Sequence, residues 1–433
     1  MPEHQTDLSY RKILIFWIPL AATWLMMSVE GPFLAALIAR SPMPKFNLAA
    51  YGVAYSFALI IEAPVIMMMS ASTALAKDFN SFIKLRNFTF SLSAAITILM
   101  LIFTIPDIFY FITTDLINLP DEVSRLTHIA TVILIPWPGA IGYRRFYQGV
   151  LIRNELTRRV AYGTIIRLTT MAATATILFI IFKTDGVIIG AASLSAGVTF
   201  EAIASRFMVN DVIKKLRLKS SNNDLSLKEI FYFYYPLALT SLIGLGIQPL
   251  VTFFVGQSRM AIESLAVLPV VTSFVFIFRA MGLSYQEVVI ALLSQNKKNF
   301  KMIKNFAAIL AISLVIVLAI ISFSSLSLIW FKDVSGLSDL LSEFARIPLM
   351  IMAIFPALTV LINVQRGILV NQKFTKPITT ATVIEFLIVI VTMLITIKYF
   401  SAVGAIAATL AFVIGRIMAN LYLNYSLKNK TTI

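Results

Sequence analysis

The sequence predicts an all-α polytopic membrane protein, with about twelve transmembrane helices in two six-helix repeats around a central cleft. Three observations predict this fold class. First, 59% of the 433 residues are hydrophobic and only 13% are charged. Second, runs of about 20 apolar residues, enough to cross the ~30 Å hydrocarbon core of a bilayer, recur along the chain. Third, the second half of the chain repeats features of the first half at a fixed shift.

The composition and the charge exclude several classes of protein. A typical soluble domain carries roughly 25% charged residues, about twice the share found here. Because the chain has no Cys, and His4 and His128 are its only histidines, a disulfide scaffold, a zinc site and a Cys/His nucleophile are excluded. The net charge of +15 comes from short Lys and Arg tracts between apolar runs, which is typical of membrane anchoring. We therefore expect contacts with membrane lipids and no nucleic-acid partner.

The apolar runs predict the spans in chain order. The first run begins at Ile13; it is too long for a signal-peptide core and has no small-residue cleavage site, so it is interpreted as a span. Continuous apolar runs also exclude a transmembrane barrel, whose strands alternate over about ten residues. The predicted spans are 13–39, 47–76, 88–112, 127–152, 160–182, 187–213, 230–255, 262–294, 303–331, 340–370, 377–399 and 401–426.

The distribution of Lys and Arg predicts the orientation. An even number of spans places both termini on one side, and the loops on that side carry most of the basic residues, among them Lys214, Lys215 and Arg217. The loops on the opposite side carry few, such as Arg40 and Lys45. Since cytoplasmic loops are enriched in Lys and Arg, we expect both termini in the cytoplasm and a location in the plasma (inner) membrane.

A polar stretch at the middle of the chain divides it into two similar halves. This stretch, from Lys214 to Glu229, predicts an N-terminal six-helix lobe over 1–213, a cytoplasmic linker over 214–228 and a C-terminal six-helix lobe over 229–433. A shift of 217 positions carries one half onto the other, and the matched pairs include Pro19/Pro236, Thr23/Thr240 and Pro32/Pro249. Two repeats of six spans share one orientation, which is a known transporter arrangement with the substrate site between the halves.

Several segments resemble patterns of one transporter group. SVEGPFLAALIA lies near the end of the first span. YQGVLIRNELTRRVAYG and VQRGILVNQKFTKPITT lead from the fourth span to the fifth in each half, and DGVIIGAASLSA and SAVGAIAATLAF open the sixth and twelfth spans. The chain resembles the MATE (multidrug and toxic-compound extrusion) transporters of the multidrug/oligosaccharidyl-lipid/polysaccharide (MOP) flippase superfamily. It is also similar to the branch related to the progressive ankylosis protein.

The resemblance implies a carrier that works by alternating access and has no enzymatic activity or cofactor. In several members of the group, an acid in the first helix binds the coupling ion, and Glu30 holds that place here. Two departures leave the substrate class open: the drug exporters usually have Asp at that place, and RSPMPKFN replaces the glycine-rich loop that normally precedes the second span.

Charged residues inside predicted spans are candidates for function, because a charge at a helix centre costs about 2.5–3.5 kcal/mol on insertion scales. Glu30 follows a long uncharged stretch and precedes Pro32, and a carboxyl group in such a place can hold a proton. We predict ion coupling, by H⁺ or Na⁺, at Glu30 and Glu62. The alternative for Glu30 is a structural pair with an Arg at a helix interface.

The repeat relates charges of opposite sign. A shift of 217 carries Glu62 onto Arg279, and a shift of 218 carries Arg167 onto Glu385. These relations predict two interlobe pairs, which would form in one access state and break in the other; pairing within each half is the alternative. Because Arg suits the binding of carboxylate or phosphate, we also predict an electropositive substrate cleft. Its predicted residues are Arg144, Arg145, Arg167 and Arg279.

The leading functional hypothesis is a secondary active exporter of small organic compounds, anionic ones included. The chain has no GxxxxGK[ST] loop for nucleotide phosphates, which disfavours an ATP-driven pump. A flippase for a lipid-linked or polyanionic substrate is the second hypothesis. A non-transporting membrane scaffold or a lipid-processing enzyme is the alternative from a different class. The sequence leaves the substrate, the coupling ion and the oligomeric state open.

Overall fold

The computed structural model describes residues 8–116, 119–218, 225–295 and 299–429, and these residues are almost entirely helical. Twelve helices or joined helix pairs in this part of the chain are long and apolar enough to cross a membrane, which confirms the prediction of a multi-pass all-α protein. They are Tyr10–Ile38, Pro44–Leu75, Phe79–Phe103, Asp121–Arg153, Thr157–Phe182, Gly186–Leu218, Leu227–Gly256, Ala261–Leu293, Phe300–Phe323, Asp339–Asn371, Lys376–Lys398 and Gly404–Lys428.

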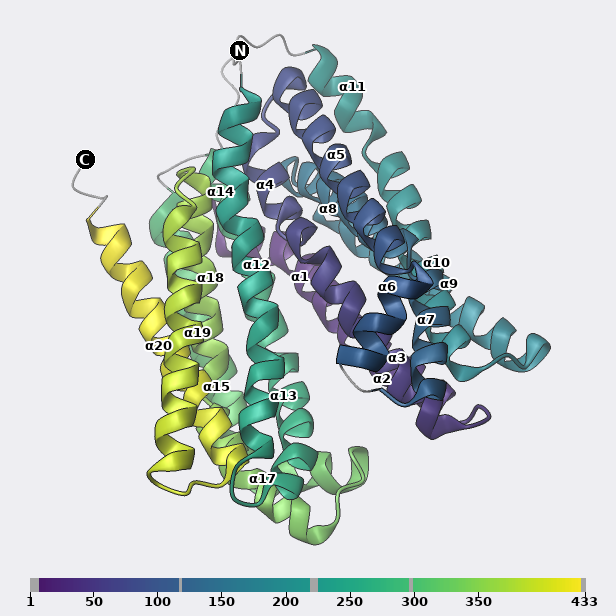
Figure 1. Cartoon of the computed structure of the whole chain (residues 1–433). Coiled ribbons are helices and arrows are strands. Elements are labelled where there is room, and N and C mark those ends of the chain that lie inside the picture. The colour runs from purple at the N-terminus through teal and green to yellow at the C-terminus, as the bar shows by residue number, and fades with distance from the viewer. Residues whose placement is uncertain (1–7, 117–118, 219–224, 296–298, 430–433) are drawn as a thin grey trace. The chain divides into compact units, whose positions relative to one another are not determined.

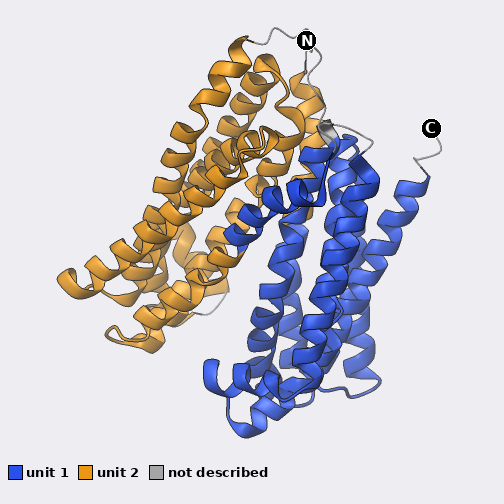
Figure 2. Ribbon diagram, turned by 180° about the vertical axis from the view of Figure 1, so that it is seen from behind, with its two compact units in different colours: residues 1–24, 242–433 blue, residues 25–241 orange. Residues whose placement is uncertain are grey.

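The chain folds into two compact units (Figure 2). Unit 2 comprises Leu25–Ser241, and unit 1 comprises Met1–Trp24 together with Leu242–Ile433. The two boundaries, after Trp24 and after Ser241, stand 217 positions apart, which is the shift of the sequence repeat. Helices α1 (Tyr10–Ser28) and α12 (Leu227–Gly256) therefore each contribute residues to both units. The division of the chain into lobes at a linker over 214–228 stays a prediction, since residues 219–224 lie outside the described part.

Unit 2 packs its helices around α8. This helix contacts α4, α5 and α10, and α9 lies along α10 (Figure 1). The helices of unit 2 are α2 (Glu30–Ile38), α3 (Pro44–Glu62), α4 (Met68–Leu75), α5 (Phe79–Phe103), α6 (Pro106–Tyr110), α7 (Asp121–Ile133), α8 (Pro136–Arg153), α9 (Thr157–Ile177), α10 (Gly186–Met208) and α11 (Asn210–Leu218), with a 3₁₀ turn, η1, at Ala63–Val65 and π-helical turns η2 at Phe111–Leu116 and η3 at Leu178–Phe182.

Unit 1 repeats this arrangement around α18. This helix contacts α14, α15 and α20, and α19 lies along α20. The helices of unit 1 are α13 (Ala261–Leu283), α14 (Tyr285–Gln295), α15 (Phe300–Phe323), α16 (Leu326–Leu328), α17 (Asp339–Met352), α18 (Phe355–Asn371), α19 (Lys376–Lys398) and α20 (Gly404–Lys428), with a π-helical turn, η5, at Ile329–Val334.

Backbone conformations show the same repeat. Met43 and Met260, 217 positions apart, both have a positive φ, of 46° and 53°, directly before a helix. Lys183 and Ser401, 218 positions apart, have φ values of 48° and 47°. A positive φ is uncommon for residues other than Gly, so its recurrence at matched positions is strong support for duplication of the chain.

Several spans are broken, and the breaks position the charged side chains. Helix α3 ends at Glu62 because Pro64 in η1 removes a backbone donor and its ring disfavours a continuous helix. Helices α7 and α8 are likewise separated at Leu134 and Ile135, just before Pro136. Such interruptions are tolerated in a membrane only where other groups satisfy the freed backbone atoms.

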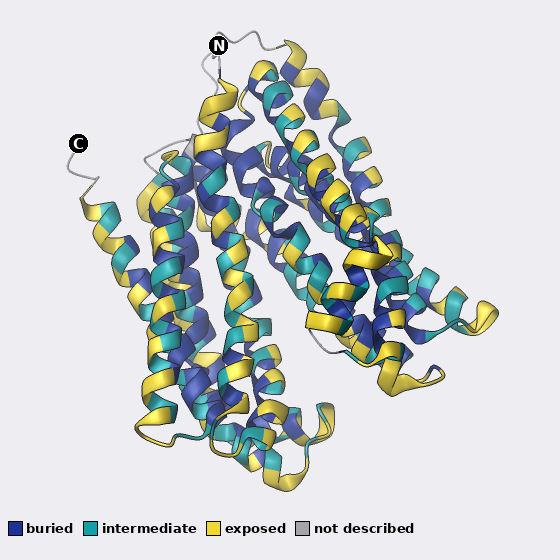
Figure 3. Cartoon of the chain, in the orientation of Figure 1, coloured by how far each residue is buried: buried dark blue, intermediate teal, exposed yellow. Residues whose placement is uncertain are grey.

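Each unit has its own apolar core. Figure 3 shows where exposed residues lie along the helices, and many of these exposed residues are large and apolar. Ile98, Ile180 and Phe207 in unit 2, and Ile312 and Ile316 in unit 1, are each more than half exposed. A soluble protein rarely exposes apolar patches of this extent, whereas the lipid-facing surface of a membrane protein has this character.

Candidate functional site

In unit 2, Glu62 is buried at the break after α3. Its side chain is held by Trp137 at the start of α8, whose indole Nε1 donates a hydrogen bond to Glu62 Oε2. In the described part of the chain, no Lys, Arg or His nitrogen lies within ion-pair distance of the Glu62 carboxylate. Glu62 is therefore a buried carboxyl group that accepts a hydrogen bond from a neutral donor and forms no salt bridge with a described residue.

The other predicted coupling residue, Glu30, forms an ion pair. Glu30 begins α2 after an interruption at Val29, and its Oε2 lies 2.5 Å from Arg167 Nη2 in α9. The guanidinium of Arg167 also lies 5.4 Å from the centroid of the Trp137 ring, close enough for a cation–π contact. Glu30 Oε1 is buried without a hydrogen-bond partner among the described residues. Arg167 and Trp137 thus connect the surroundings of Glu30 and Glu62.

A third carboxylate, Glu201 in α10, lies at the centre of a buried polar network. Its Oε2 is 2.6 Å from Arg144 Nη1 and 3.9 Å from Arg167 Nη1. Its Oε1 accepts hydrogen bonds from Gln148 Nε2 at 3.0 Å and from Thr164 Oγ1 at 3.4 Å. Arg144 and Gln148 are four residues apart, so they share one face of α8.

The sequence analysis did not assign a role to Glu201, Gln148 or Trp137. The spacing of Arg144 and Gln148 on one helical face was a signal for a shared acceptor. The sequence alone did not identify that acceptor, because Glu201 follows Arg144 by 57 positions.

In unit 1, the repeat counterpart of the Glu62 site carries the opposite charge. Phe355 at the start of α18 stands 218 positions after Trp137 and is buried, with an exposure of 2%. The guanidinium carbon of Arg279, from α13, lies 4.6 Å from the centroid of the Phe355 ring, and that of Arg416, from α20, lies 5.0 Å from it. Arg416 Nε donates to Glu385 Oε1 at 2.8 Å. Two positively charged Arg side chains therefore lie over one aromatic ring at this site.

The predicted site residues are thus distributed over both units. Unit 2 brings Glu30 together with Arg167, and Arg144 with Glu201; Arg145 Nη1 approaches Met69 Sδ at 3.7 Å. The members of each predicted interlobe pair, Glu62 with Arg279 and Arg167 with Glu385, belong to different units, so both pairs and the central cleft stay predictions.

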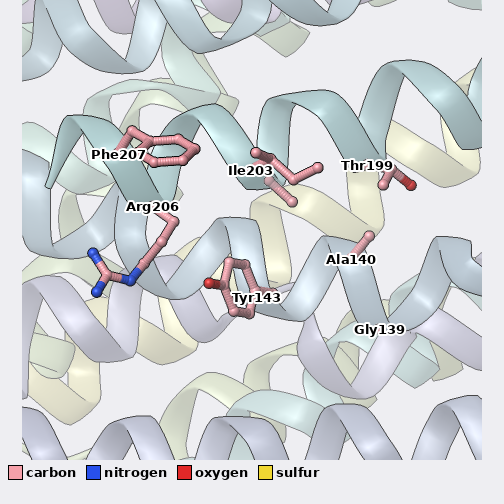
Figure 4. A pocket seen from close by; sticks show the side chains of 8 residues that line it. Gly139, Ala140, Tyr143, Thr199, Ile203, Arg206 and Phe207 are labelled. Carbon is pink, nitrogen blue, oxygen red and sulfur yellow. The ribbon is translucent and has the colours of Figure 1, made fainter.

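Figure 4 shows a pocket of about 430 Å³ in unit 2, between α8 and α10. The pocket is predominantly apolar, and the network around Glu201 contributes no residue to it. Ile203 and Phe207, which line it, are strongly exposed on the outer face of α10. Its lining residues are Gly139, Ala140, Tyr143, Thr199, Ala202, Ile203, Arg206 and Phe207.

Comparison with solved structures finds proteins of the same fold. A mutant of the Vibrio cholerae MATE transporter VcmN has a TM-score of 0.74 and 14% identity, over 97% of this chain and 97% of its own. The eukaryotic MATE transporter AtDTX14 has a TM-score of 0.77 and 12% identity, over 96% of this chain and 95% of its own. A MOP superfamily transporter from Pyrococcus furiosus, whose binding pocket is described as having reverse polarity, has a TM-score of 0.72 and 13% identity, over 97% and 95%.

No protein-family model matches the chain, and no curated protein sequence matches it. At 12–14% identity, the structural likeness shows the fold. The chain has the fold of MATE transporters, as the sequence motifs implied. The similarity to the branch related to the progressive ankylosis protein stays a prediction.

Proposed function

We propose that this chain is a secondary active exporter of small organic compounds, which works by alternating access and is driven by an ion gradient. The MATE-transporter fold supports the general class. We place the protein in the plasma membrane with both termini in the cytoplasm, as the Lys and Arg of the loops indicate.

The observation that carries the coupling mechanism is the environment of Glu62. In a buried ion pair, the basic partner stabilises the ionised carboxylate. Protonating that carboxylate leaves the charge of the partner buried and uncompensated. Glu62 has a hydrogen bond from Trp137 instead, so its carboxyl group can take up and release an ion without leaving a salt bridge broken. We therefore propose Glu62 as the primary coupling residue.

Glu30 has a second role in this proposal. Protonation of Glu30 would weaken its ion pair with Arg167, whose guanidinium also lies near Glu201 and over the Trp137 ring. Uptake of an ion at Glu30 would thus change the contacts of a residue that connects the two carboxyl sites. Arg167 is a positioning residue in this scheme.

Transport in proteoliposomes tests the function. Purified protein is reconstituted, a pH or Na⁺ gradient is imposed, and movement of a fluorescent organic cation and a fluorescent organic anion is followed. We expect gradient-driven transport that is lost in Glu62→Gln and strongly reduced in Glu30→Gln. Glu343→Gln is the matched control, because the Glu343 side chain is 65% exposed and makes only a surface pair. Gradient-driven transport that persists in Glu62→Gln would exclude this coupling role.

The flippase hypothesis predicts a different result in the same vesicles. Scrambling of a labelled anionic lipid without any gradient would support it over the exporter. If neither the fluorescent compounds nor the labelled lipid move, the results favour a membrane scaffold or a lipid-processing enzyme.

The two interlobe pairs are part of the proposal and need their own test. If Glu62 and Arg279 interact in one access state, the effects of Glu62→Gln and Arg279→Gln on transport will not add. The same cycle applies to Arg167 and Glu385. Additive effects in either cycle would remove that pair from the mechanism.

A further inference from the structure

The sites around Trp137 and Phe355 are repeat counterparts with inverted chemistry. In unit 2, an acid, Glu62, accepts a hydrogen bond from the indole N–H of Trp137. In unit 1, a base, Arg279, takes the corresponding place and an indole is replaced by the phenyl ring of Phe355. A phenyl ring has no donor for a carboxylate, but its face attracts a cation. Each aromatic residue therefore suits the charge beside it: the indole N–H of Trp137 binds the carboxylate of Glu62, and the ring face of Phe355 attracts the guanidinium of Arg279.

Arg279 nevertheless forms no ion pair with the described residues of its own unit. Among the residues that the structure describes, none forms a hydrogen bond or an ion pair with its guanidinium, and its Nε is buried without a partner. Arg279 as a whole is partly exposed. A cation at membrane depth is expensive unless it is compensated, and a face-on aromatic ring compensates only a small part.

The neighbouring charges do not supply the compensation. Glu385 is engaged by Arg416, through the 2.8 Å contact of Arg416 Nε with Glu385 Oε1. Arg366 in α18 donates to the neutral Thr382 hydroxyl at 3.0 Å. Among the described residues, the guanidinium groups of Arg279 and Arg416 both lie over the Phe355 ring, and the Glu385 carboxylate is ion-paired with Arg416. The corresponding network in unit 2 has Glu30, Glu62 and Glu201 beside its Arg residues.

We propose that Arg279, on the face of Phe355, is the binding site for an oxyanion, a carboxylate or a phosphate group. Arg416, whose guanidinium lies over the same ring, adds positive charge beside it. The planar guanidinium of Arg279 is suited to bind two oxygen atoms of such a group. This site deepens the proposed function, on which it rests, because it assigns an anionic group to the transported compound. That group is carried either by a small organic anion or by an anionic lipid.

Binding to the purified full-length chain tests the site without any need for transport. The protein in a neutral detergent is heated with sodium benzoate, inorganic phosphate or dioctanoyl phosphatidylglycerol, with chloride adjusted to constant ionic strength and dioctanoyl phosphatidylcholine as the lipid control. A ligand that binds the folded state raises the unfolding temperature in a concentration-dependent way. We expect such a rise with at least one anionic probe, and a more than tenfold weaker apparent affinity in Arg279→Gln.

Two further variants keep the test decisive. Arg125→Gln removes an Arg whose side chain is 53% exposed and should respond like the unmodified protein. Arg279→Lys keeps the positive charge but loses the planar set of guanidinium donors, so its affinity for the anion should fall several-fold. This variant provides the test if Arg279→Gln does not fold. A rise with benzoate or phosphate assigns a water-soluble anion, and a rise with phosphatidylglycerol alone assigns a lipid headgroup.

The site is overturned if no anionic probe shifts the unmodified protein, or if Arg279→Lys binds as tightly as the unmodified protein does. Gradient-driven transport without anion binding removes this site and leaves the exporter intact. Anion binding without transport leaves the site and removes the exporter.

Discussion

Trp17 and Tyr234 stand 217 positions apart, and each donates a hydrogen bond to a backbone carbonyl. The two acceptor residues, Met281 and Pro64, are also 217 positions apart. Trp17 Nε1 donates to Met281 O at 3.2 Å and to Ser284 Oγ at 2.9 Å. The Tyr234 hydroxyl donates to Pro64 O at 2.6 Å. Both carbonyls lie beside the break of a membrane-spanning helix, where freed backbone groups need partners. The two aromatic residues therefore have the same structural role, one in each unit.

This equivalence predicts similar losses of stability. Trp17→Phe and Tyr234→Phe keep an aromatic ring and remove the donor, so each should lower the free energy of unfolding by about 1 kcal/mol. Thermal unfolding in detergent measures the loss. Trp330→Phe is the matched control for Trp17, because Trp330 Nε1 is buried and has no hydrogen-bond partner among the described residues. If Trp17→Phe lowers stability no more than Trp330→Phe, the hydrogen bond does not stabilise this helix break.

A second prediction concerns the buried pair of Arg144 and Glu201, whose side chains are 2% and 0% exposed. Glu201→Gln leaves the Arg144 charge uncompensated in the interior, so we expect a loss of about 3–5 kcal/mol. Glu343→Gln breaks the exposed pair with Arg346, which should lower stability by less than about 1 kcal/mol. Thermal unfolding of both variants, measured side by side, checks the difference.

The double variant Arg144→Leu/Glu201→Leu separates charge from packing. Because it removes both charges together, it should be more stable than Glu201→Gln. If the double variant is as unstable as Glu201→Gln, the pair stabilises the protein through packing and not through charge.

A third prediction concerns the donor to Glu62. Trp137→Phe reproduces the aromatic residue that unit 1 has at the matched position and removes the indole N–H. Since that hydrogen bond holds the Glu62 carboxyl group at the helix break, its loss should lower gradient-driven transport several-fold. Trp330→Phe should leave transport unchanged. Unchanged transport in Trp137→Phe would show that Trp137 does not position Glu62.

The sequence predicted the spans well, because apolar runs of about 20 residues reflect a single physical requirement, the thickness of the bilayer. The repeat also followed from the sequence, through matches such as Pro19/Pro236, and the recurring positive φ of Met43 and Met260 agrees with it. The breaks within spans were less predictable. Pro64 marks one of them, but Pro19 and Pro269 lie inside continuous helices.

The partners of the site residues depend on tertiary packing that periodicity does not report. Glu30 and Arg167 were both recognised as candidates, but they lie 137 positions apart, so their pairing needed the structure. The sequence repeat could have matched Trp137 with Phe355. Each precedes a conspicuous Gly in its helix, Gly149 after Trp137 and Gly367 after Phe355. A shift of 218, one more than that of Glu62/Arg279, separates them.

The last prediction concerns close helix contacts that both units share. Gly149 in α8 lies against α4, where an added Cβ would meet Ser72 Oγ at 1.9 Å and Met69 O at 2.3 Å. Its counterpart Gly367 in α18 lies against α14, where the Cβ would meet Val289 Cβ at 2.7 Å.

Small residues let membrane helices approach closely, so Gly149→Ala and Gly367→Ala should each lower stability by about 1–3 kcal/mol through overpacking. Gly52 is also helical but has open space around it, so Gly52→Ala should be neutral or stabilise the protein by up to about 1 kcal/mol. Thermal unfolding in detergent compares the three. Because the Met69 contact in α4 is a backbone atom, which cannot rotate away, Gly149→Ala should be the most harmful of them. A stabilising Gly149→Ala would mean that α4 and α8 can move apart freely.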